Sequence, residues 1–398
     1  MSAFLVSGKR TPVGRYGGAL ASVRPDDLAA LTIKTVVEDA GLPPEAVDEV
    51  IYGNANGAGE ENRNVARMAW LLAGFPDTVP GITVNRLCAS GMSAISLAAA
   101  MIEAGQADVV VAGGVESMSR APWVMEKPDK PFAKPGEVFD TSIGWRFVNP
   151  IFQQQEKTTF SMPETAEEVA RVKHISRAEA DEFAVRSQTL ASKAIEEGRF
   201  ANEIVPVEIT DRKGNVTVVD TDEGPRAGTT MEVLAKLRPV VKGGEVVTAG
   251  NSSSLNDGAS AIIVASEAAV DKYGLTARAK VVASAAAGLA PEVMGLGPIP
   301  ATQKLLARTG WSTDEVDAYE INEAFATQSV ASVRELGLDL DKVNLWGGAI
   351  ALGHPLGSSG ARITITLLNR LEQEAGTRGI ATMCIGVGQG TAIALERV

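Results

Sequence analysis

Few side chains in this sequence could act as a nucleophile or a general base, because its 398 residues include only two cysteines and two histidines. One cysteine, Cys88, lies in the segment NRLCASG, between the apolar segment 81–84 and a long run of small residues that begins at Ser90. This pattern predicts a strand, a sharp turn and a buried helix. Unpaired N–H groups at a helix start favour a thiolate, so we predict that Cys88 is a reactive nucleophile. The alternative is a buried, unreactive cysteine.

Three further motifs carry groups that could cooperate with this nucleophile. His354 lies in the glycine-rich segment GHPLGSSG and could take the thiol proton and then donate to an oxyanion, although a histidine in such a turn is often structural. Cys384 is a second thiol close to Gly386, whose backbone N–H could contribute to an oxyanion hole. Asn322, in NEAFA, supplies a neutral donor. His174 lies among charged residues, and we expect it on the surface.

Strands and helices that could position these motifs alternate along the first 120 residues. We expect a helix over 25–40, capped by an aspartate, and a buried strand within 107–119 that runs into a glycine turn. This alternation is typical of an α/β domain with helices on a mainly parallel sheet. Residues 121–249 are richer in charge and turns, and we interpret them as an insertion that covers a site. The alternation resumes with an expected strand at 246–248.

The C-terminal part of the chain repeats the N-terminal part. Residues 40–55 align with residues 309–324 at a constant offset of 269, and the same offset places Cys88 opposite Gly357 in a second glycine turn. The segment 381–390 likewise resembles the apolar strand that follows the Cys88 helix. We therefore expect two copies of one α/β unit, packed about a pseudo-twofold axis, with equivalent strand ends facing one site.

Composition limits the classes of partner and site. The net charge of −12 argues against nucleic acid as a partner, and no apolar run approaches the roughly 18 residues of a membrane span. The first residues do not resemble a signal peptide. Two distant cysteines predict no disulfide framework, and without paired C-x-x-C spacing they predict no zinc site. We therefore expect a cytoplasmic protein that binds no metal.

Six motifs together give the chain a specific resemblance to the thiolase family, the acetyl-CoA acyltransferases. They occur in the family's order and spacing over essentially the whole chain: NRLCASGMSA, VAGGVESMS, TAGNSSSLNDGA, NEAFA, ALGHPLGSSGARI and MCIGVGQG. The resemblance implies a duplicated five-layer αβαβα core with an inserted loop domain. It assigns residues 1–120 and 250–270 to an N-terminal domain, 121–249 to the loop domain and 271–398 to a C-terminal domain. It also implies a homotetramer built as a dimer of dimers.

The resemblance implies a role for each candidate residue. Cys88 would attack a 3-ketoacyl thioester and become acylated, with His354 activating it. Cys384 would protonate the leaving acetyl-CoA carbanion or deprotonate the incoming CoA thiol. Asn322, through a water molecule, and His354 would form one oxyanion hole, and the backbone N–H groups of Cys88 and Gly386 would form the other. CoA is a substrate in this scheme, which requires neither a metal nor a permanently bound cofactor.

For CoA binding, the resemblance points to residues from three segments. Arg226 would lie near the adenine and phosphate end, Ala249 and Ser253 along the pantetheine, and Met162 and Phe325 along the tunnel. Arg226 could instead be an ordinary surface arginine, and Ser253 could serve only to form a turn.

The resemblance also extends to the acyl group of the substrate. The segments 59–69, 144–150 and 161–170 resemble the 3-oxoadipyl-CoA thiolases of aromatic catabolism. Because that substrate ends in a carboxylate, whose burial is costly without a partner, we expect an arginine in the pocket. Arg146 is the candidate and Arg67 the reserve, although either could form a structural salt bridge at a subunit contact.

Other functions compete with this interpretation. Acetoacetyl-CoA or general β-oxidation substrates are the alternatives within the family. A decarboxylating condensing enzyme shares the fold but uses one cysteine and two histidines, whereas Cys384 fills the second histidine's position here. A non-catalytic acyl-CoA-binding or lipid-binding relative would tolerate the loss of Cys88, His354 or Cys384, and all three are present.

Overall fold

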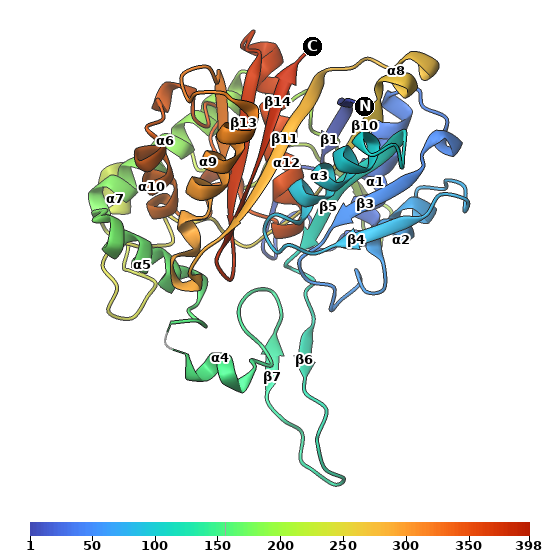
Figure 1. The fold of residues 1–398 in the computed structure, drawn as a ribbon. Coiled ribbons are helices and arrows are strands. Elements are labelled where there is room, and N and C mark those ends of the chain that lie inside the picture. The colour runs from blue at the N-terminus through green and yellow to red at the C-terminus, as the bar shows by residue number, and fades with distance from the viewer. Residues whose placement is uncertain (156) are drawn as a thin grey trace.

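A ten-stranded sheet runs through the computed structural model, which describes residues 1–155 and 157–398 (Figure 1). Its strands are, in spatial order, β12 (Ala318–Ile321), β13 (Arg378–Ile385), β14 (Gln389–Arg397), β11 (Ala279–Gly288), β1 (Ala3–Arg10), β10 (Asn256–Ser266), β5 (Val109–Ser117), β3 (Glu49–Gly53) and β4 (Gly81–Val84). The short strand β2 (Gly14–Arg15) pairs with β10 outside this path.

The sheet consists of two halves with matching strand order. From the centre outward, β1, β10, β5 and β3 in one half correspond to β11, β14, β13 and β12 in the other. β12 begins 269 residues after β3, and β13 begins 269 residues after β5. The halves meet where β1 pairs with β11 through Phe4 with Lys280 and Leu5 with Ala279. The predicted duplication is therefore confirmed.

Helices form three layers around the two half-sheets. The helices α3 (Ser90–Glu103) and α12 (Leu356–Gln373) lie between the halves and share one apolar core with strands of both (Figure 1). α1 (Pro25–Asp39) and α2 (Val65–Leu72) cover the outer face of the N-terminal half. α9 (Pro298–Thr309) and α10 (Ala326–Leu336) lie on the outer side of the C-terminal half. The expected five-layer αβαβα core is thus confirmed.

Two glycines allow the central helices to approach closely. A Cβ atom on Gly91 of α3 would lie 2.8 Å from the backbone nitrogen of Ala361, and one on Gly360 of α12 would lie 2.4 Å from the backbone nitrogen of Met92. Neither separation is possible for real atoms, so each helix needs glycine where the other crosses it. The turns that precede these helices carry Cys88 and His354, so this close packing also sets the distance between the two motifs.

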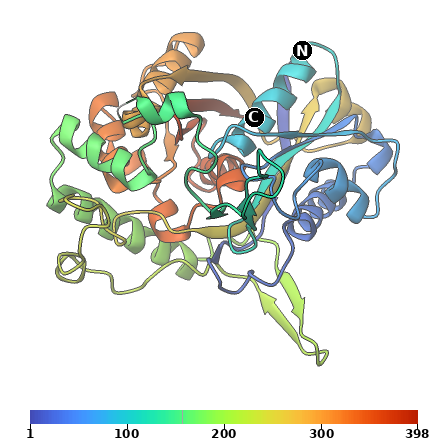
Figure 2. The ribbon, with the colours of Figure 1, turned by 90° about the horizontal axis from the view of Figure 1, so that it is seen from below.

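Residues 121–155 and 157–249 contribute no strand to the large sheet, as expected for an insertion. They contain β6 (Trp123–Met125), β7 (Val138–Asp140), α4 (Pro150–Gln154), α5 (Met162–Lys173), α6 (Arg177–Glu196), β8 (Val207–Thr210), β9 (Val216–Val219) and α7 (Met231–Leu234). β6 and β7 form an arm that projects from the body in Figure 1, and the hairpin of β8 and β9 projects separately at the lower right of Figure 2. The remaining short elements are η1 (Pro44–Ala46), α8 (Glu267–Tyr273), η2 (Pro291–Leu296), η3 (Leu340–Lys342) and α11 (Ala349–Leu352).

Four local expectations were wrong. The sheet is mixed rather than mainly parallel, because β1, β10, β11 and β14 all pair in antiparallel fashion with their neighbours. Gly113 and Gly114 do not form a turn but continue β5, where a Cβ would lie 2.1 Å and 2.0 Å from carbonyl oxygens. Residues 246–248 form no strand, because the N–H groups of Val246 and Val247 bind the Glu167 carboxylate instead. No aspartate caps α1, whose N-cap is Arg24.

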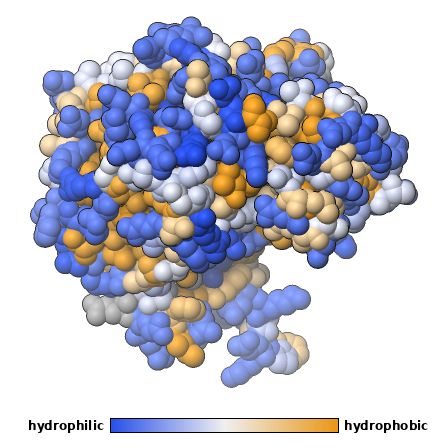
Figure 3. All heavy atoms as spheres, turned by 45° about the horizontal axis from the view of Figure 1, so that its top comes forward, coloured by the Kyte–Doolittle hydropathy of each residue, from blue (hydrophilic) through white to orange (hydrophobic). Residues whose placement is uncertain are grey.

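On the face drawn in Figure 3, hydrophilic residues predominate and apolar residues appear between them in small groups. None of the helices in the described ranges is both long and apolar enough to cross a membrane.

Candidate active site

Cys88 lies in the tight turn between β4 and α3. Leu87, just before it, has a positive φ of 49°, and the Ser90 hydroxyl accepts from the Arg86 N–H and donates to the Leu87 carbonyl. These contacts turn the chain so that the Cys88 side chain is half-buried beside the central core. The backbone N–H of Gly386, at the end of β13, points at its sulfur. The turn therefore brings two of the predicted residues together.

His354 follows α11 and precedes α12, and hydrogen bonds define its tautomer. The Ser359 hydroxyl donates to the Pro355 carbonyl at 2.8 Å, so it must accept from the Nδ1–H of His354, 2.6 Å away. The Nε2 lone pair then faces the Nδ2 group of Asn322, at 3.3 Å. The backbone N–H of His354 donates to Asn256 Oδ1 at 2.9 Å. The imidazole is thus held neutral, with its basic nitrogen directed at Asn322.

Asn322 and Cys384 come from the ends of adjacent parallel strands. Asn322 directly follows β12, and its N–H donates to the Thr382 carbonyl in β13. Cys384, two residues farther along β13, is 1 % exposed and packs with Met162 and Phe325 in one apolar cluster. The charged form of Cys88 lies close enough to raise the pKa of Cys384. One site is therefore surrounded by both thiols, the imidazole and Asn322.

The pKa of Cys88 does not follow the expectation that the helix start favours its thiolate. Burial raises the pKa of the Cys88 thiol to about 11, and the N–H groups of Gly386 and of Cys88 itself only partly oppose this. Burial also raises the pKa of Cys384 above its ordinary value. Burial, and then the positive charge of Arg362, lower the pKa of His354 to about 3. Apolar packing outweighs the helix start, because Cys88 lies two residues before α3 rather than in its first turn.

Two buried carboxylates hold the candidate site together, and neither was predicted. Glu116, at the end of β5, accepts from the N–H groups of Ala55 at 2.9 Å, Asn56 at 3.1 Å and Gly357 at 2.9 Å. It thereby joins the loop after β3 to the first turn of α12, three residues beyond His354. Burial raises the pKa of Glu116 to about 7. The sequence did hold a signal for Glu116, because it is a single acidic residue in the apolar segment VVVAGGVES.

Glu323 is the second buried carboxylate, and it directly follows Asn322. It accepts from the Ser187 hydroxyl at 2.6 Å, from Asn344 Nδ2 at 2.8 Å and from the Ile350 N–H at 3.2 Å. These bonds tie the end of β12 to α6 and to α11, the helix that leads into His354. Burial raises the pKa of Glu323 above its ordinary value.

The residues expected to bind CoA fall into two groups. Arg226 and Ala249 line one cavity of about 350 Å³, together with Arg15 and Leu237. Met162 and Phe325 lie instead in the apolar cluster with Cys384. Ser253 connects the groups, since its N–H donates to the carbonyl of Ala324, the neighbour of Phe325.

The two candidate arginines have different surroundings. Arg146 is half-buried, donates from Nη2 to Asn56 Oδ1 at 3.0 Å, and its charge acts on Glu116 beneath the site. Arg67 donates to the carbonyl oxygens of Asp77 and Val79 in the loop between α2 and β4. The guanidinium of Arg67 is therefore engaged with the backbone of its own chain, and among the described residues it forms no salt bridge.

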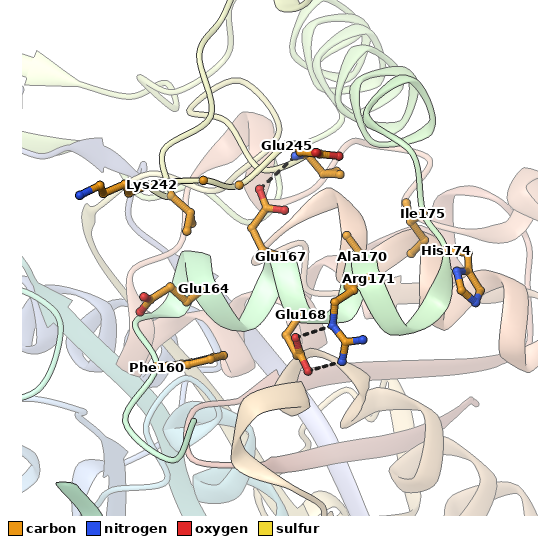
Figure 4. A pocket seen from close by; sticks show the side chains of 14 residues that line it. Phe160, Glu164, Glu167, Glu168, Ala170, Arg171, His174, Ile175, Lys242 and Glu245 are labelled. Carbon is orange, nitrogen blue, oxygen red and sulfur yellow. Dashed lines mark hydrogen bonds and ion pairs between the residues drawn. The ribbon is translucent and has the colours of Figure 1, made fainter. Parts of the chain in front are cut away.

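A groove of about 500 Å³ between α5 and the loop 241–246 lies apart from these residues, and none of the catalytic candidates lines it (Figure 4). Two of its acidic groups are already engaged: Glu168 pairs with Arg171, and Glu167 binds the N–H groups of residues 246 and 247. His174, at the end of α5, is exposed at its rim, as expected.

Comparison with known families covers nearly the whole chain. The family described as "Thiolase, N-terminal domain" matches residues 3–268, and "Thiolase, C-terminal domain" matches residues 275–397. The chain belongs to the thiolase family. It is therefore an acyltransferase, and the predictions of family, fold class and enzyme class are confirmed.

Individual relatives span the full length of this thiolase. A protein named beta-ketoadipyl-CoA thiolase from Pseudomonas aeruginosa is 56 % identical, with 99 % of both chains covered. The "3-oxoadipyl-CoA/3-oxo-5,6-dehydrosuberyl-CoA thiolase" of Escherichia coli is 54 % identical, covering 100 % of this chain and 99 % of its own. An acetyl-CoA acetyltransferase from Syntrophomonas wolfei is 46 % identical, with 98 % of both covered.

Solved structures agree with this assignment. The acetyl-CoA acetyltransferase of Bacillus anthracis superimposes with a TM-score of 0.93 at 43 % identity, covering 100 % of this chain and 99 % of its own. Human mitochondrial 3-ketoacyl-CoA thiolase gives 0.91 at 38 % identity with the same coverage.

Proposed function

We propose that this thiolase cleaves 3-oxoadipyl-CoA with CoA, giving acetyl-CoA and a dicarboxylic acyl-CoA shortened by two carbons. The observation that carries the proposal is the identity gradient among full-length relatives. Proteins named for this substrate are 52–56 % identical to the chain, whereas the acetyl-CoA acetyltransferase of Syntrophomonas wolfei is 46 % identical. Acetoacetyl-CoA and unsubstituted 3-ketoacyl-CoA thioesters are the competing substrates.

The first half-reaction would begin from uncharged groups. Cys88 Sγ bonds to the 3-keto carbon while its proton passes to Nε2 of His354. The bond between C2 and C3 then breaks, and its electron pair moves to C2 of the departing acetyl-CoA. The thiol of Cys384 gives its proton to C2, which releases acetyl-CoA and leaves the shortened acyl group on Cys88. The N–H groups of Cys88 and Gly386 would stabilise the oxyanion on the keto oxygen, and Asn322 with His354 the enolate oxygen.

The second half-reaction would restore the starting state. The thiolate of Cys384 takes the proton of an incoming CoA thiol, whose sulfur attacks the acyl carbon. The bond to Cys88 Sγ breaks, and Sγ recovers its proton from His354. In this scheme CoA is only a substrate, which would enter through the cavity of Arg226 and Ala249. Ser253, Met162 and Phe325 would flank the path from that cavity to Cys384.

Arg146 would recognise the distal carboxylate of the substrate. Its guanidinium has a single side-chain hydrogen bond among the described residues, to Asn56, so most of its donors are available. The Asn56 loop also meets the nucleophile turn, because Asn85 Nδ2 donates to the Ala55 carbonyl at 3.0 Å. A cation at this place would compensate the cost of burying a carboxylate.

The proposal also includes a homotetramer built as a dimer of dimers, in the cytoplasm and without a nucleic-acid or membrane partner. Two exposed surfaces support the assembly. The arm of β6 and β7 exposes Trp123, Met125, Phe132 and Val138. β4 is an edge strand with its Ile82 exposed, and unpaired edges favour pairing with another chain. The division into domains at 1–120 with 250–270, 121–249 and 271–398 belongs to the same proposal.

A panel of 3-oxoadipyl-CoA, acetoacetyl-CoA and 3-oxohexanoyl-CoA tests the substrate. We expect the highest kcat/KM for 3-oxoadipyl-CoA. Arg146→Ala should lower that value by on the order of 10- to 100-fold, because a charge-assisted bond is lost, and leave acetoacetyl-CoA cleavage largely intact. Arg67→Ala is the matched control and should not change the preference. A wild-type preference for unsubstituted chains would refute the dicarboxylate proposal.

A further inference from the structure

The side chains of Asn56 and Arg146 form a contact that joins two loops. Nη2 of Arg146 donates to Oδ1 of Asn56 at 3.0 Å, although the two residues are 90 positions apart in the sequence. Both side chains are half-buried. Among the described residues, the guanidinium of Arg146 forms no salt bridge and no other hydrogen bond. Within the described chain, Asn56 therefore provides the one directed contact of this cation.

Hydrogen bonds determine which way the Asn56 amide points. Its Nδ2 group donates to the carbonyl oxygen and to Oγ1 of Thr141, both at 3.0 Å. The Thr141 hydroxyl donates its own proton to the Pro122 carbonyl at 2.6 Å, so it can only accept from Asn56. Because both atoms on that side are acceptors, the nitrogen of the amide must face Thr141 and its oxygen must face Arg146.

The backbone around Asn56 is anchored to the turns that carry the nucleophile and the base. The Asn56 N–H donates to the Glu116 carboxylate at 3.1 Å, and the same carboxylate accepts from the N–H of Gly357 in the first turn of α12. From the nucleophile turn, Asn85 Nδ2 donates to the Ala55 carbonyl at 3.0 Å. The Asn56 amide, and the guanidinium that it holds, are therefore fixed relative to the candidate active site.

An amide oxygen orients a guanidinium without cancelling its charge. A carboxylate in the place of Asn56 would also accept from Arg146, but it would form a salt bridge and neutralise the cation. Glu116, on which the charge of Arg146 acts, accepts from three backbone N–H groups instead. Arg146 therefore keeps its charge and most of its donors.

We propose that Asn56 is a specificity-determining positioning residue, whose uncharged amide aligns Arg146 with the distal carboxylate of a dicarboxylic 3-ketoacyl thioester. The inference rests on the proposed role of Arg146 in recognising that carboxylate. The amide holds the guanidinium through Nη2, which leaves other N–H groups for a two-bond contact with the substrate. Asn56 acts through Arg146 and does not touch the reacting atoms.

The test compares 3-oxoadipyl-CoA with its distal methyl ester, which has nearly the same shape but no charge at that end. Asn56→Asp pairs Arg146 with a carboxylate of the protein, so the ratio of kcat/KM for the acid to that for the ester should fall by on the order of 10- to 100-fold. The loss should appear in KM rather than kcat, because the contact lies away from the carbons that react. A variant that lowers kcat for both substrates alike would show only a structural role and refute the inference.

Asn62→Asp is the matched control. It adds the same charge to the same loop, but Asn62 is exposed and its amide group donates only to the Gly59 carbonyl. This variant should keep the wild-type ratio of acid to ester. A fall in the ratio as large as that of Asn56→Asp would refute the inference, because it would reflect the added charge alone.

A double-mutant cycle shows whether the effect passes through the guanidinium. In an Arg146→Ala background, Asn56→Asp should not change the ratio further, and an equal fall with and without Arg146 would refute the inference. If Asn56→Asp does not fold, Asn56→Ala serves in the same cycle. It frees the guanidinium without neutralising it, so the ratio should fall less, again only when Arg146 is present.

The wild-type enzyme and Arg146→Ala separate this inference from the proposed substrate. A wild-type enzyme that does not prefer the acid to the ester would refute both. If the wild type prefers the acid and Arg146→Ala removes the preference, the role of Arg146 stands. An unchanged preference in the Asn56 variants would then refute the role of Asn56 alone.

Discussion

At the scale of residues, the candidate site is uncharged before substrate arrives. The pKa of Cys88 is about 11 and that of His354 is about 3, so neither the thiolate nor the imidazolium is populated at neutral pH. Proton transfer must therefore accompany the attack of sulfur on the keto carbon, when negative charge moves to the oxyanion donors. A resting thiol of this kind also resists unwanted alkylation and oxidation better than a thiolate would.

Single mutants should distinguish the roles of the two thiols. Cys384→Ala should slow carbon–carbon bond cleavage by about 10²- to 10⁴-fold, the usual value of a general acid, yet Cys88 should still become acetylated by acetyl-CoA. His354→Ala should slow that acetylation itself. Mass spectrometry of the acyl-enzyme distinguishes the two effects, with Cys88→Ala as the unlabelled control. A Cys384→Ala variant that cannot be acylated would contradict the assigned roles.

Residue types and local spacing indicated the reactive groups, but not their ionisation. The turn around Cys88 and the position of His354 before a helix follow from local sequence. The pKa values depend first on burial and then on groups such as Gly386 and Arg362, which approach only in the folded chain. Glu116 and Glu323 were missed for the same reason, since their partners lie far away in the sequence: backbone N–H groups for Glu116, and two side chains and one backbone N–H for Glu323.

At the scale of elements, the contact between α3 and α12 fixes where the nucleophile and the base stand. Gly360→Ala should destabilise the protein by about 1–3 kcal/mol, because the new methyl group would overlap the backbone at Met92. It should also lower kcat without removing the cysteine or the histidine. Thermal unfolding and turnover of the purified variant measure both effects. Gly376→Ala is the control, because its nearest neighbours are side-chain atoms at 3.0 Å or more. Equal stability of the two variants would contradict this account.

Periodicity predicted several helices and strands, but it could not predict strand direction. Hydrophobic runs such as 261–264 indicate burial and do not specify which neighbour pairs with them. The glycines of β5 illustrate the same limit. In the sequence Gly113 and Gly114 suggest a turn, but in the structure they are needed because the carbonyl oxygens of Ser260 and Gly357 leave no room for a Cβ atom.

At the scale of the whole molecule, the arm of β6 and β7 should govern assembly. Trp123→Ser with Phe132→Ser removes apolar surface from the arm, and we expect the tetramer to dissociate to dimers because that surface is the proposed contact. Sedimentation velocity measures the mass. Val216→Ser with Val218→Ser alters exposed valines on the other projecting hairpin and is the matched control. A wild-type monomer, or dissociation in the control alone, would refute the assembly.

The shared core of α3 and α12 has a consequence for any shortened form of the chain. Each central helix packs on strands of its own half-sheet and on the central helix of the other half, and α12 also packs on β5 and β10 of the other half-sheet. A fragment holding one half would leave the apolar surface between the halves in water, and only a second half of the same shape could cover it. Two fragments produced separately should therefore be poorly soluble alone and should recover a folded core when mixed. The full-length chain behaves, in this sense, as a dimer whose two members are joined by a peptide link.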